Sequence, residues 1–304
     1  MKLDLVWIIY RKNSDIAEKK ANQLISKLAK INIKTISSKS QFNKNPISEI
    51  ISTKKQLPDL VIVLGGDGTV LEAVRYIIGH SIPLLSFNVG GNLGFLSNES
   101  SILKNDSLWD QIINDHYSIE KRMMIEASIK KINSDRIENI NTFSALNDFY
   151  LKAADDNISP TCNLQLEIDG EIVDEYKGDG LILSSPTGST AYSMASGGSI
   201  LHPKLEAIIV SPICPMSLSS RPIVVPGDSK LVISLLDKNQ NPIKLWQDGS
   251  VATFLNFDEK CVFKKSIHQA HMIKLNDTPS YYQTLSHKLH WAGSLKGFDR
   301  KNIF

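Results

Sequence analysis

The chain has 304 residues, 42% of them hydrophobic and 22% charged, and its formal net charge is +2. This length and composition are typical of a soluble globular protein with two ordinary domains or one large α/β domain. The near-balanced charge excludes the concentrated basic excess of a dedicated nucleic-acid binder, so we expect no nucleic-acid partner. Solvated helix faces explain the local excess of eleven Lys and Arg in residues 11–57, and a field that attracts phosphates is the alternative.

The first third of the chain alternates apolar strand runs with helical patterns. Ser14 and Asp15 are typical of a helix N-terminus, and the third strand run leads directly into a helical pattern that stops at Gly79. We expect a polar loop from residue 38 to about residue 55. Strands that alternate with helices predict a parallel sheet covered by helices. The expected strands are residues 3–10, 31–37, 59–65 and 82–88.

After about residue 120 the pattern changes to short, partly alternating apolar runs separated by turn residues. Asp169-Gly170 lies between two such runs, which is a strong local signal for a hairpin turn. The tail is helical again from 279 to 291, with Tyr282, Leu285 and Leu289 on one face. We therefore expect an α/β domain at residues 1–120, an all-β domain at 121–275 and a helical tail at 276–304.

The spacing of cysteines and histidines and the length of the apolar runs indicate the cellular compartment of the protein. Cys162, Cys214 and Cys261 form no C-x-x-C pair, and the seven histidines form no H-x-x-x-H pair. These spacings predict no disulfide framework and no protein-bound metal, so a reducing cytosol is the default. No apolar run approaches the roughly 18 residues of a membrane span, and Asp4 interrupts any signal-peptide core. We expect a cytoplasmic protein with no membrane partner.

The stretch Gly65-Gly66-Asp67-Gly68-Thr69 stands where the third strand ends and a helix begins. At such a point the free N–H groups and the positive dipole end of the helix point outward, and glycines let the backbone approach an anion. A carboxylate repels phosphate, so Asp67 must bind a hydroxyl or a metal, or accept a proton from a nucleophile. The competing interpretation is a glycine turn in which Asp67 caps the helix. The spacing matches neither the G-x-x-x-x-G-K-[ST] loop nor the dinucleotide G-x-G-x-x-G motif.

Two further Gly-rich stretches indicate a ligand site. FNVGGNLGFLS, residues 87–97, follows the fourth strand, so two neighbouring strands end in glycine loops at one sheet edge, as in a shared binding crevice. Residues 176–203 crowd Gly, Ser and Thr around Lys177, Asp179 and Tyr192. Such residues contribute little apolar burial, so a ligand is expected to fill the missing volume, with Tyr192 stacking on a base. The alternative for residues 87–97 is a flexible loop, and the alternative for residues 176–203 is an exposed linker.

Asn147 and Asp148 stand side by side inside an apolar strand pattern. Two such polar side chains are costly there unless the backbone or a ligand forms hydrogen bonds with both.

These residues and the glycine stretches together resemble the NAD kinase family, because its motifs occur in the expected order over nearly the whole chain. The motifs are GGDGT, NLGFL, LND, GDGLILSSPTGSTAYSMASGG, HPKLEAIIVSPICPMSLSSRPIVV, DGS and the tail YYQTLSHKLHW. GGDGT alone is shared with diacylglycerol and sphingosine kinases, whereas PTGSTAYS is far more specific.

The resemblance implies an α/β plus β fold, in which a β-sandwich domain follows the parallel-sheet domain and the tail returns to the first domain. It implies transfer of the ATP γ-phosphate to the 2′-hydroxyl of the adenosine ribose of NAD, giving NADP. A divalent cation, usually Mg²⁺, accompanies the ATP, and Asp67 matches the residue taken as the proton acceptor. Family members are commonly dimers or tetramers, so NAD, ATP and further copies of this chain are the implied partners.

The resemblance also implies a set of binding residues. Asn147 and Asp148 would hydrogen-bond hydroxyls or base atoms of NAD, and Lys177 would pair with a phosphate of the dinucleotide. The nucleotide-binding set is Gly66, Asp67, Gly68, Thr69, Asn147, Asp148, Lys177, Asp179, Thr187, Thr190, Ala191, Tyr192 and Ser193.

The sequence departs from the common family pattern at several positions. Asp148 replaces the more usual Glu, Met216 stands where His is frequent, Ser250 stands where Gln is frequent, and the NVGGNLGF loop is one residue longer. These departures bear on substrate preference and not on the reaction.

Two rival functions remain. A lipid kinase on this fold would expose an apolar or basic membrane-facing patch, and a non-catalytic NAD(P)-binding regulator would have little reason to keep Asp67.

Overall fold

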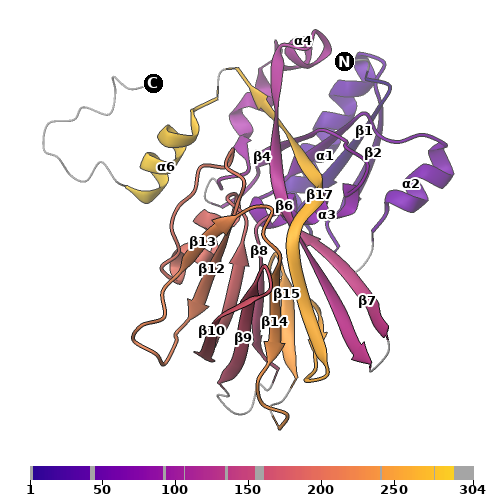
Figure 1. Cartoon of the computed structure of the whole chain (residues 1–304). Coiled ribbons are helices and arrows are strands. Elements are labelled where there is room, and N and C mark those ends of the chain that lie inside the picture. The colour runs from indigo at the N-terminus through magenta and orange to yellow at the C-terminus, as the bar shows by residue number, and fades with distance from the viewer. Residues whose placement is uncertain are drawn as a thin grey trace, which may run out of the picture.

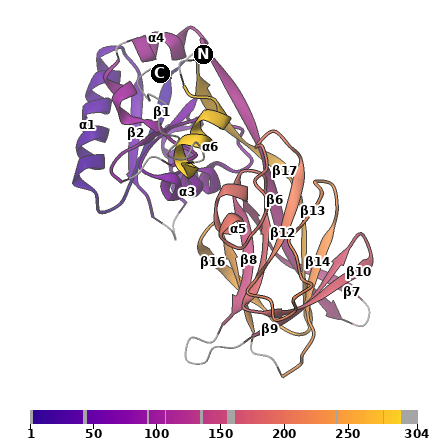
Figure 2. The ribbon, with the colours of Figure 1, turned by 90° about the vertical axis from the view of Figure 1, so that its left-hand side faces the viewer.

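The computed structural model describes residues 3–41, 45–91, 94–105, 107–133, 136–154, 161–239, 242–276 and 278–290. It has an α/β part and a β part, which two long strands connect (Figures 1 and 2). These strands are β6 (Tyr117–Asn133) and β17 (Glu259–Leu275), and they pair antiparallel over nearly their whole length.

The α/β part is built on a parallel sheet in the order β4-β3-β1-β2. All four expected strands are present, and the five residues of β3 are all buried, as expected for a central strand covered on both faces. The strands are β1 (Leu5–Tyr10), β2 (Lys34–Lys39), β3 (Leu60–Leu64), β4 (Leu84–Asn88) and the short β5 (Asn98–Glu99). The helices are α1 (Asp15–Lys30), α2 (Ile47–Lys54), α3 (Asp67–Ile77), the 3-10 turn η1 (Ser100–Lys104) and α4 (Ser107–Ile113).

Alternation along the strands divides the apolar side chains between two cores, one on each face of this sheet. Val6 and Ile8 pack with α1 and α4, whereas Trp7 and Ile9 pack with α2 and α3. The predicted start of α1 is confirmed, because Ser14 is its N-cap and accepts the Ala17 N–H at 3.3 Å.

The expected polar loop from residue 38 to about residue 55 is wrong for the segment that forms α2. Ile47 and Ile50 are buried in the core beneath α3, and Ile51 packs against the same core. These three apolar residues have helical spacing, so their burial stabilises a short helix within an otherwise polar segment.

In the β part, a six-stranded antiparallel sheet, β13-β12-β11-β8-β15-β16, faces the outer strands of the larger sheet. The predicted hairpin turn is confirmed, since Asp169 and Gly170 both have positive φ and join two antiparallel strands. The remaining strands are β7 (Arg136–Ala145), β8 (Asp148–Ala153), β9 (Cys162–Ile168), β10 (Glu171–Gly178), β11 (Gly180–Ser184), β12 (Ala207–Ile213), β13 (Ile223–Pro226), β14 (Leu231–Leu235), β15 (Ile243–Gln247) and β16 (Ser250–Leu255).

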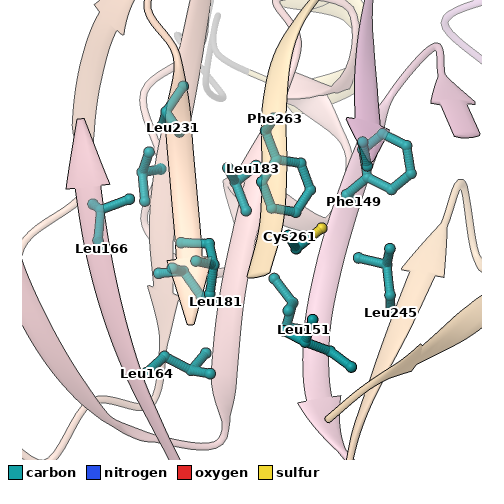
Figure 3. Packing of buried hydrophobic residues seen from close by; sticks show 14 of the residues in the cluster. Phe149, Leu151, Leu164, Leu166, Leu181, Leu183, Leu231, Leu245, Cys261 and Phe263 are labelled. Atoms are coloured by element: carbon teal, nitrogen blue, oxygen red, sulfur yellow. The ribbon is translucent and has the colours of Figure 1, made fainter. Parts of the chain in front are cut away.

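The core of the β part lies between these two sheets (Figure 3). Phe149 of β8 and Phe263 of β17 meet across the layer, with ring centroids 5.7 Å apart. Leu151, Leu181 and Leu231 are fully buried around them. The expected β-sandwich is therefore confirmed.

The larger sheet runs without a break from the β part into the parallel strands, because β17 pairs with β4 through Met272 and Leu84. The predicted domain boundary at residue 120 falls inside β6, so the division into 1–120, 121–275 and 276–304 stays a prediction. Among the described helices, none is long and apolar enough to cross a membrane.

The tail forms α6 (Tyr281–Leu289), which begins with a capping box between Ser280 and Gln283. Its predicted apolar face is only partly right. Leu285 is buried, but Tyr282 is 67% exposed, and Tyr281 makes the inward contact instead. Tertiary contacts decide which of two adjacent tyrosines faces inward, and helical spacing alone does not show it.

Candidate functional site

The turn from β3 into α3 places Asp67 at the first helical position. Gly66 is the N-cap, and no side chain caps this helix. The interpretation of Asp67 as a helix cap is therefore wrong. Gly65 is required by packing, because a Cβ there would lie 2.4 Å from Oγ1 of Thr69. At Gly66 and Gly68, a Cβ would have no heavy atom of the described residues within 4 Å. The backbone at the start of α3 is consequently open to an approaching ligand.

Asp67 instead contacts the second glycine loop. Its Oδ2 accepts the N–H of Phe95 at 2.7 Å, and its Oδ1 accepts the N–H of Leu96 at 3.1 Å. Gly94 lies against this carboxylate so closely that a Cβ there would be 1.7 Å from Oδ1. The two glycine loops predicted to share a crevice are thus in direct contact, and the carboxylate of Asp67 is held in one orientation.

Asn147 and the turn after β11 form a second group of site residues. The Asn147 carbonyl accepts the N–H of Ser185 at 2.8 Å, and a Cβ at Gly188 would lie 2.2 Å from the same oxygen. Oδ1 of Asn147 and Oγ1 of Thr187 are buried and have no hydrogen-bond partner among the described residues. Because buried polar atoms rarely stay unpaired, these two atoms mark positions where a ligand would complete the hydrogen bonding.

Asp148 is buried next to a second carboxylate, that of Asp248 in the turn between β15 and β16. Asp248 accepts the N–H groups of Leu146, Asn147 and Asp148 at 2.8–3.2 Å, and these hydrogen bonds oppose the burial that raises the pKa of Asp248. Burial, together with the charge of Asp248, raises the pKa of Asp148 to about 8. Asp148 therefore holds a proton at neutral pH and can donate a hydrogen bond.

Three aromatic rings line the same region. Tyr192, at the start of α5 (Tyr192–Ala195), lies edge-on to Tyr150 with centroids 5.1 Å apart. Tyr150 in turn stacks on Trp246 at 5.4 Å. Burial raises the pKa of Tyr150 to about 12, with smaller contributions from Asp148 and Tyr192. Tyr192 is thus perpendicular to the stacked pair of Tyr150 and Trp246, and aromatic rings of this kind are groups on which a nucleotide base can stack.

Helix α3 connects the two groups. Asp67 is its first residue, and Arg75 lies eight positions later, roughly 12 Å along the helix at 1.5 Å per residue. Nη2 of Arg75 donates to the carbonyl of Gln247 at 3.3 Å, beside Asp248. The carboxylate of Asp67 and the pocket around Asn147 are therefore fixed relative to each other by one rigid helix.

Three other predicted residues of the 187–193 segment differ from Thr187 in their surroundings. Thr190 Oγ1 contacts the carbonyl of Thr187 at 3.5 Å, within the 3-10 turn η2 (Gly188–Thr190), and Ala191 is half-buried before α5. The side chain of Ser193 is fully buried, and its Oγ is 3.0 Å from that of Ser211. Ser193 therefore supports the fold of this segment and does not face the pocket.

Lys177 and Asp179 lie away from the other predicted residues. Gly180 pairs with Lys152, whereas Ser184, at the other end of β11, pairs with Asp148. At about 3.3 Å per residue, the length of β11 separates these ends by roughly 13 Å. Lys177 lies on edge strand β10, Asp179 follows that strand directly, and both are exposed, so one chain does not bring them to the Asn147 pocket.

Several residues of the site are not among those predicted from the sequence. Tyr150 and Trp246 belong to ordinary strand patterns, and the DGS motif is the sequence signal for Asp248. Ser250, one of the departures, has a buried Oγ with no hydrogen-bond partner in the described part of the chain, and Met216 is 62% exposed. Across the residues that the structure describes, no three His, Cys, Asp or Glu side chains group closely enough to hold a metal ion.

Two family models match this sequence. The ATP-NAD kinase N-terminal domain matches residues 6–117, and the ATP-NAD kinase C-terminal domain matches residues 146–275. NAD kinase 1 of Prochlorococcus marinus (strain NATL2A) is 51% identical over 298 residues, which cover 97% of this chain and 98% of that protein. NAD kinase 1 of Parasynechococcus marenigrum (strain WH8102) is 49% identical over 308 residues, with the same coverage.

Solved structures agree with these matches. Yeast NADH kinase complexed with NADH has a TM-score of 0.82 at 26% identity, covering 98% of this chain and 90% of that chain. An NAD kinase from Archaeoglobus fulgidus in complex with ATP has a TM-score of 0.71 at 22% identity, covering 94% and 98%, which shows the shared fold. From these matches over both parts of the sequence, the chain belongs to the NAD kinase family.

Proposed function

We propose that the protein transfers the γ-phosphate of ATP to the 2′-hydroxyl of the adenosine ribose of NAD, and that Asp67 is the proton acceptor. The observation that carries this proposal is the carboxylate of Asp67, which stands at the open N-terminus of α3 but does not cap it. A carboxylate in that place is unfavourable for binding phosphate alone, and it suits a site in which a hydroxyl must lose a proton.

The transfer is a single displacement at phosphorus. The ribose O2′–H proton passes to Asp67, O2′ bonds to Pγ, and the bond between Pγ and the β–γ bridging oxygen breaks, so that ADP leaves with that oxygen. The two N–H bonds from Phe95 and Leu96 fix the carboxylate, and its remaining lone pairs are free to accept the proton. The free N–H groups at the start of α3 receive the phosphoryl oxygens.

The divalent ion belongs to the donor substrate, Mg-ATP, and would neutralise charge on the β- and γ-phosphates. The chain's own contribution is positioning, which accounts for most catalysis in phosphoryl transfer. Asn147 Oδ1 and Thr187 Oγ1 would accept hydrogen bonds from NAD, and protonated Asp148 would donate one.

One assay separates this function from its rivals. The protein is incubated with Mg-ATP and either NAD or diacylglycerol, and NADP and phosphorylated lipid are measured. Formation of NADP supports the proposal. Phosphorylation of the lipid alone would establish the lipid kinase, and binding of NAD without any product would establish the regulator.

We expect Tyr192 to stack on the adenine of NAD. Tyr192→Phe keeps the ring and should change the KM for NAD by less than about threefold. Tyr192→Ala removes the ring face and should raise that KM by about 10–100-fold, since stacking on an aromatic ring is worth roughly 1–3 kcal/mol per base. The measurement is the KM for NAD at saturating ATP. Equal effects of the two changes would show that the hydroxyl, not the ring, makes the contact.

Lys177 and Asp179 can act on NAD only from a second copy of the chain, because one chain holds them away from the pocket. The dimer or tetramer expected for the family would supply that copy. Lys177→Ala should then weaken NAD binding by about 1–3 kcal/mol, for a lost charge-assisted contact. Mixing this variant with Asp67→Asn should restore activity in hybrid oligomers. Absence of restoration, or an unchanged KM for NAD, would contradict the assignment.

Asp148 makes the stability of the fold depend on pH. An Asp ionises near pH 4 in the unfolded chain, whereas burial and Asp248 raise the folded pKa of Asp148 to about 8. Between these values the folded state holds one more proton, so this group's contribution to the free energy of unfolding falls as pH rises, by up to about 1.4 kcal/mol per unit. Asp148→Asn removes the effect.

We therefore expect the stability of Asp148→Asn, relative to the parent protein, to increase steadily from pH 5 to pH 8. Urea unfolding of both proteins at each pH measures this difference, and contributions from carboxylates that do not interact with Asp148 cancel in it. A difference that stays constant with pH would mean that Asp148 is ionised in the folded protein.

A further inference from the structure

A tight turn of the β part lies between helix α3 and the segment proposed to bind NAD. This turn, here called the 247–249 turn, joins β15 to β16, and Asp248 and Gly249 both have positive φ, as in a two-residue hairpin. Helix α3 begins with Asp67 and lies on the side of the α/β part that faces the β part (Figure 2). The turn therefore stands next to the helix that carries the proposed proton acceptor.

Hydrogen bonds hold the 247–249 turn to the segment proposed to bind NAD. The carboxylate of Asp248 accepts the N–H groups of residues 146–148 at 2.8–3.2 Å, and the N–H of Asp248 donates to the carbonyl of Asp148 at 3.0 Å. Nε2 of Gln247 donates to the carbonyl of Ser144. A movement of the turn therefore moves this whole segment.

Arg75 of α3 contacts the same turn from the other side. Its Nη2 donates to the carbonyl of Gln247 at 3.3 Å. Burial raises the pKa of Asp248, and the backbone N–H groups and the charge of Arg75 act in the opposite direction. Arg75 therefore favours the charged form of Asp248, which accepts N–H groups more strongly than the neutral form does.

Stability alone does not account for a cation at position 75. The side chain of Arg75 is half-buried, and its Nε is buried without a hydrogen-bond partner among the described residues. A guanidinium in this state has lost hydration that its contacts only partly replace. Since apolar residues of similar size often replace a buried ion pair without loss of stability, such a pair is weak evidence for a stabilising role. A directional contact between α3 and the turn is a role that an apolar residue could not fill.

Apolar packing also connects α3 to the proposed NAD pocket, but it does not set their relative orientation. Leu146 is fully buried in the core beneath α3, together with Val70 and Val74. Hydrophobic contact is non-directional, so it keeps the segment close to the helix but permits small shifts and rotations. A hydrogen bond restricts both the distance and the angle between its groups. The bond from Arg75 to the carbonyl of Gln247 supplies this restriction.

We propose that Arg75 is a positioning residue for phosphoryl transfer, which acts through the 247–249 turn to align the ribose hydroxyl of NAD, bound at Asn147, with the carboxylate of Asp67. This proposal rests on the proposed function and adds a residue that contacts neither substrate. Asp67 and Arg75 lie on one helix, so the proton acceptor and the aligning contact move together. Because phosphoryl transfer depends chiefly on positioning, a small shift of the hydroxyl lowers the rate without releasing NAD.

Steady-state kinetics of Arg75→Met test this role. Methionine keeps an unbranched side chain but removes the guanidinium. We expect kcat to fall about 10–100-fold, as for a misplacement of up to about 1 Å, while the KM values for NAD and ATP each change less than about threefold. Arg75→Lys should recover most of the loss in kcat, because an ammonium group can donate to the same carbonyl.

The matched control is Tyr76→Phe, at the next position of α3. The hydroxyl of Tyr76 contacts the carboxylate of Glu72 and the carbonyl of Gln41, so its loss perturbs the helix away from the 247–249 turn. Its kcat per folded molecule should stay within about twofold of the parent value. If the kcat of Arg75→Met also stays within that range, the proposal is overturned. A raised KM for NAD with unchanged kcat would overturn it as well, because Arg75 would then be a binding residue.

A double-mutant cycle shows whether Arg75 acts through the turn. Asp248→Asn keeps the size of the side chain but weakens its acceptance of the backbone N–H groups. If both residues act through the 247–249 turn, the kcat of the double variant should lie within about threefold of that of the more impaired single variant. Losses that multiply would mean that Arg75 acts by a separate route, which contradicts the proposal.

Hydrogen exchange separates this proposal from the proposed function. The amides of residues 146–148 bind Asp248, so loosening of the turn exposes them to solvent. Arg75→Met should raise their exchange rates about tenfold, and Tyr76→Phe should not, whether or not NADP forms. Unchanged exchange in Arg75→Met overturns the proposal even if the parent protein makes NADP. Failure of the parent to make NADP refutes the proposed function, and the exchange rates still decide whether Arg75 holds the turn.

Discussion

Asp67→Asn should reduce the turnover number by about 10²–10⁴-fold, with NAD and ATP still bound. The amide keeps the size of the carboxylate but is not basic, and loss of a general base has an effect of this size. Removing a negative charge beside the phosphates also eases nucleotide binding. The measurement is kcat at saturating ATP and NAD for a variant shown to be folded.

The two backbone contacts of Asp67 require a structural control. An amide can accept only one of the N–H groups of Phe95 and Leu96, and its own NH₂ group faces the other. We therefore expect a loss of about 1–3 kcal/mol in stability, measured by urea unfolding. If kcat remains within a few-fold of the parent while stability falls by this amount, Asp67 only anchors the loop, and the proton-acceptor role is wrong.

The sequence was sufficient to predict those features that depend on neighbours along the chain. Apolar runs located the four parallel strands, and Ser14 marked the start of α1. The glycines around Asp67 indicated the open turn between β3 and α3, because Gly66 and Gly68 carry no side chain that would cover the backbone there. In each case the physical cause is local periodicity, capping or backbone geometry.

Features that depend on contacts between distant segments were not predictable in this way. The contacts of Asp67 with Phe95 and Leu96 join two loops, and the raised pKa of Asp148 depends on Asp248, about 100 residues away. The antiparallel register of β11 separates Lys177 from the pocket even though it lies near Thr187 in sequence. The resemblance implied that the tail returns to the first domain, but not that Lys288 would lie over Phe95.

Gly94→Ala should reduce turnover by about 100-fold even though it replaces no side chain of the proposed active site. The new Cβ would lie 1.7 Å from Oδ1 and 2.2 Å from Cγ of Asp67, far inside van der Waals contact. Either the carboxylate or the loop must therefore move by about 1 Å or more, and a misplacement of this size can lower a rate about 10²-fold. Overpacking should also reduce the free energy of unfolding by about 1–3 kcal/mol.

A double-mutant cycle with Asp67→Ala shows whether this effect acts through the carboxylate. Asp67→Ala removes all three atoms that the Gly94 Cβ would meet, so the two changes are coupled. Gly94→Ala should destabilise the parent protein by about 1–3 kcal/mol but the Asp67→Ala protein hardly at all. Urea unfolding of the four proteins measures this coupling. Equal destabilisation in both backgrounds would mean that Gly94 is required by the loop itself, and that the close approach of the loop to Asp67 does not determine the position of the proton acceptor.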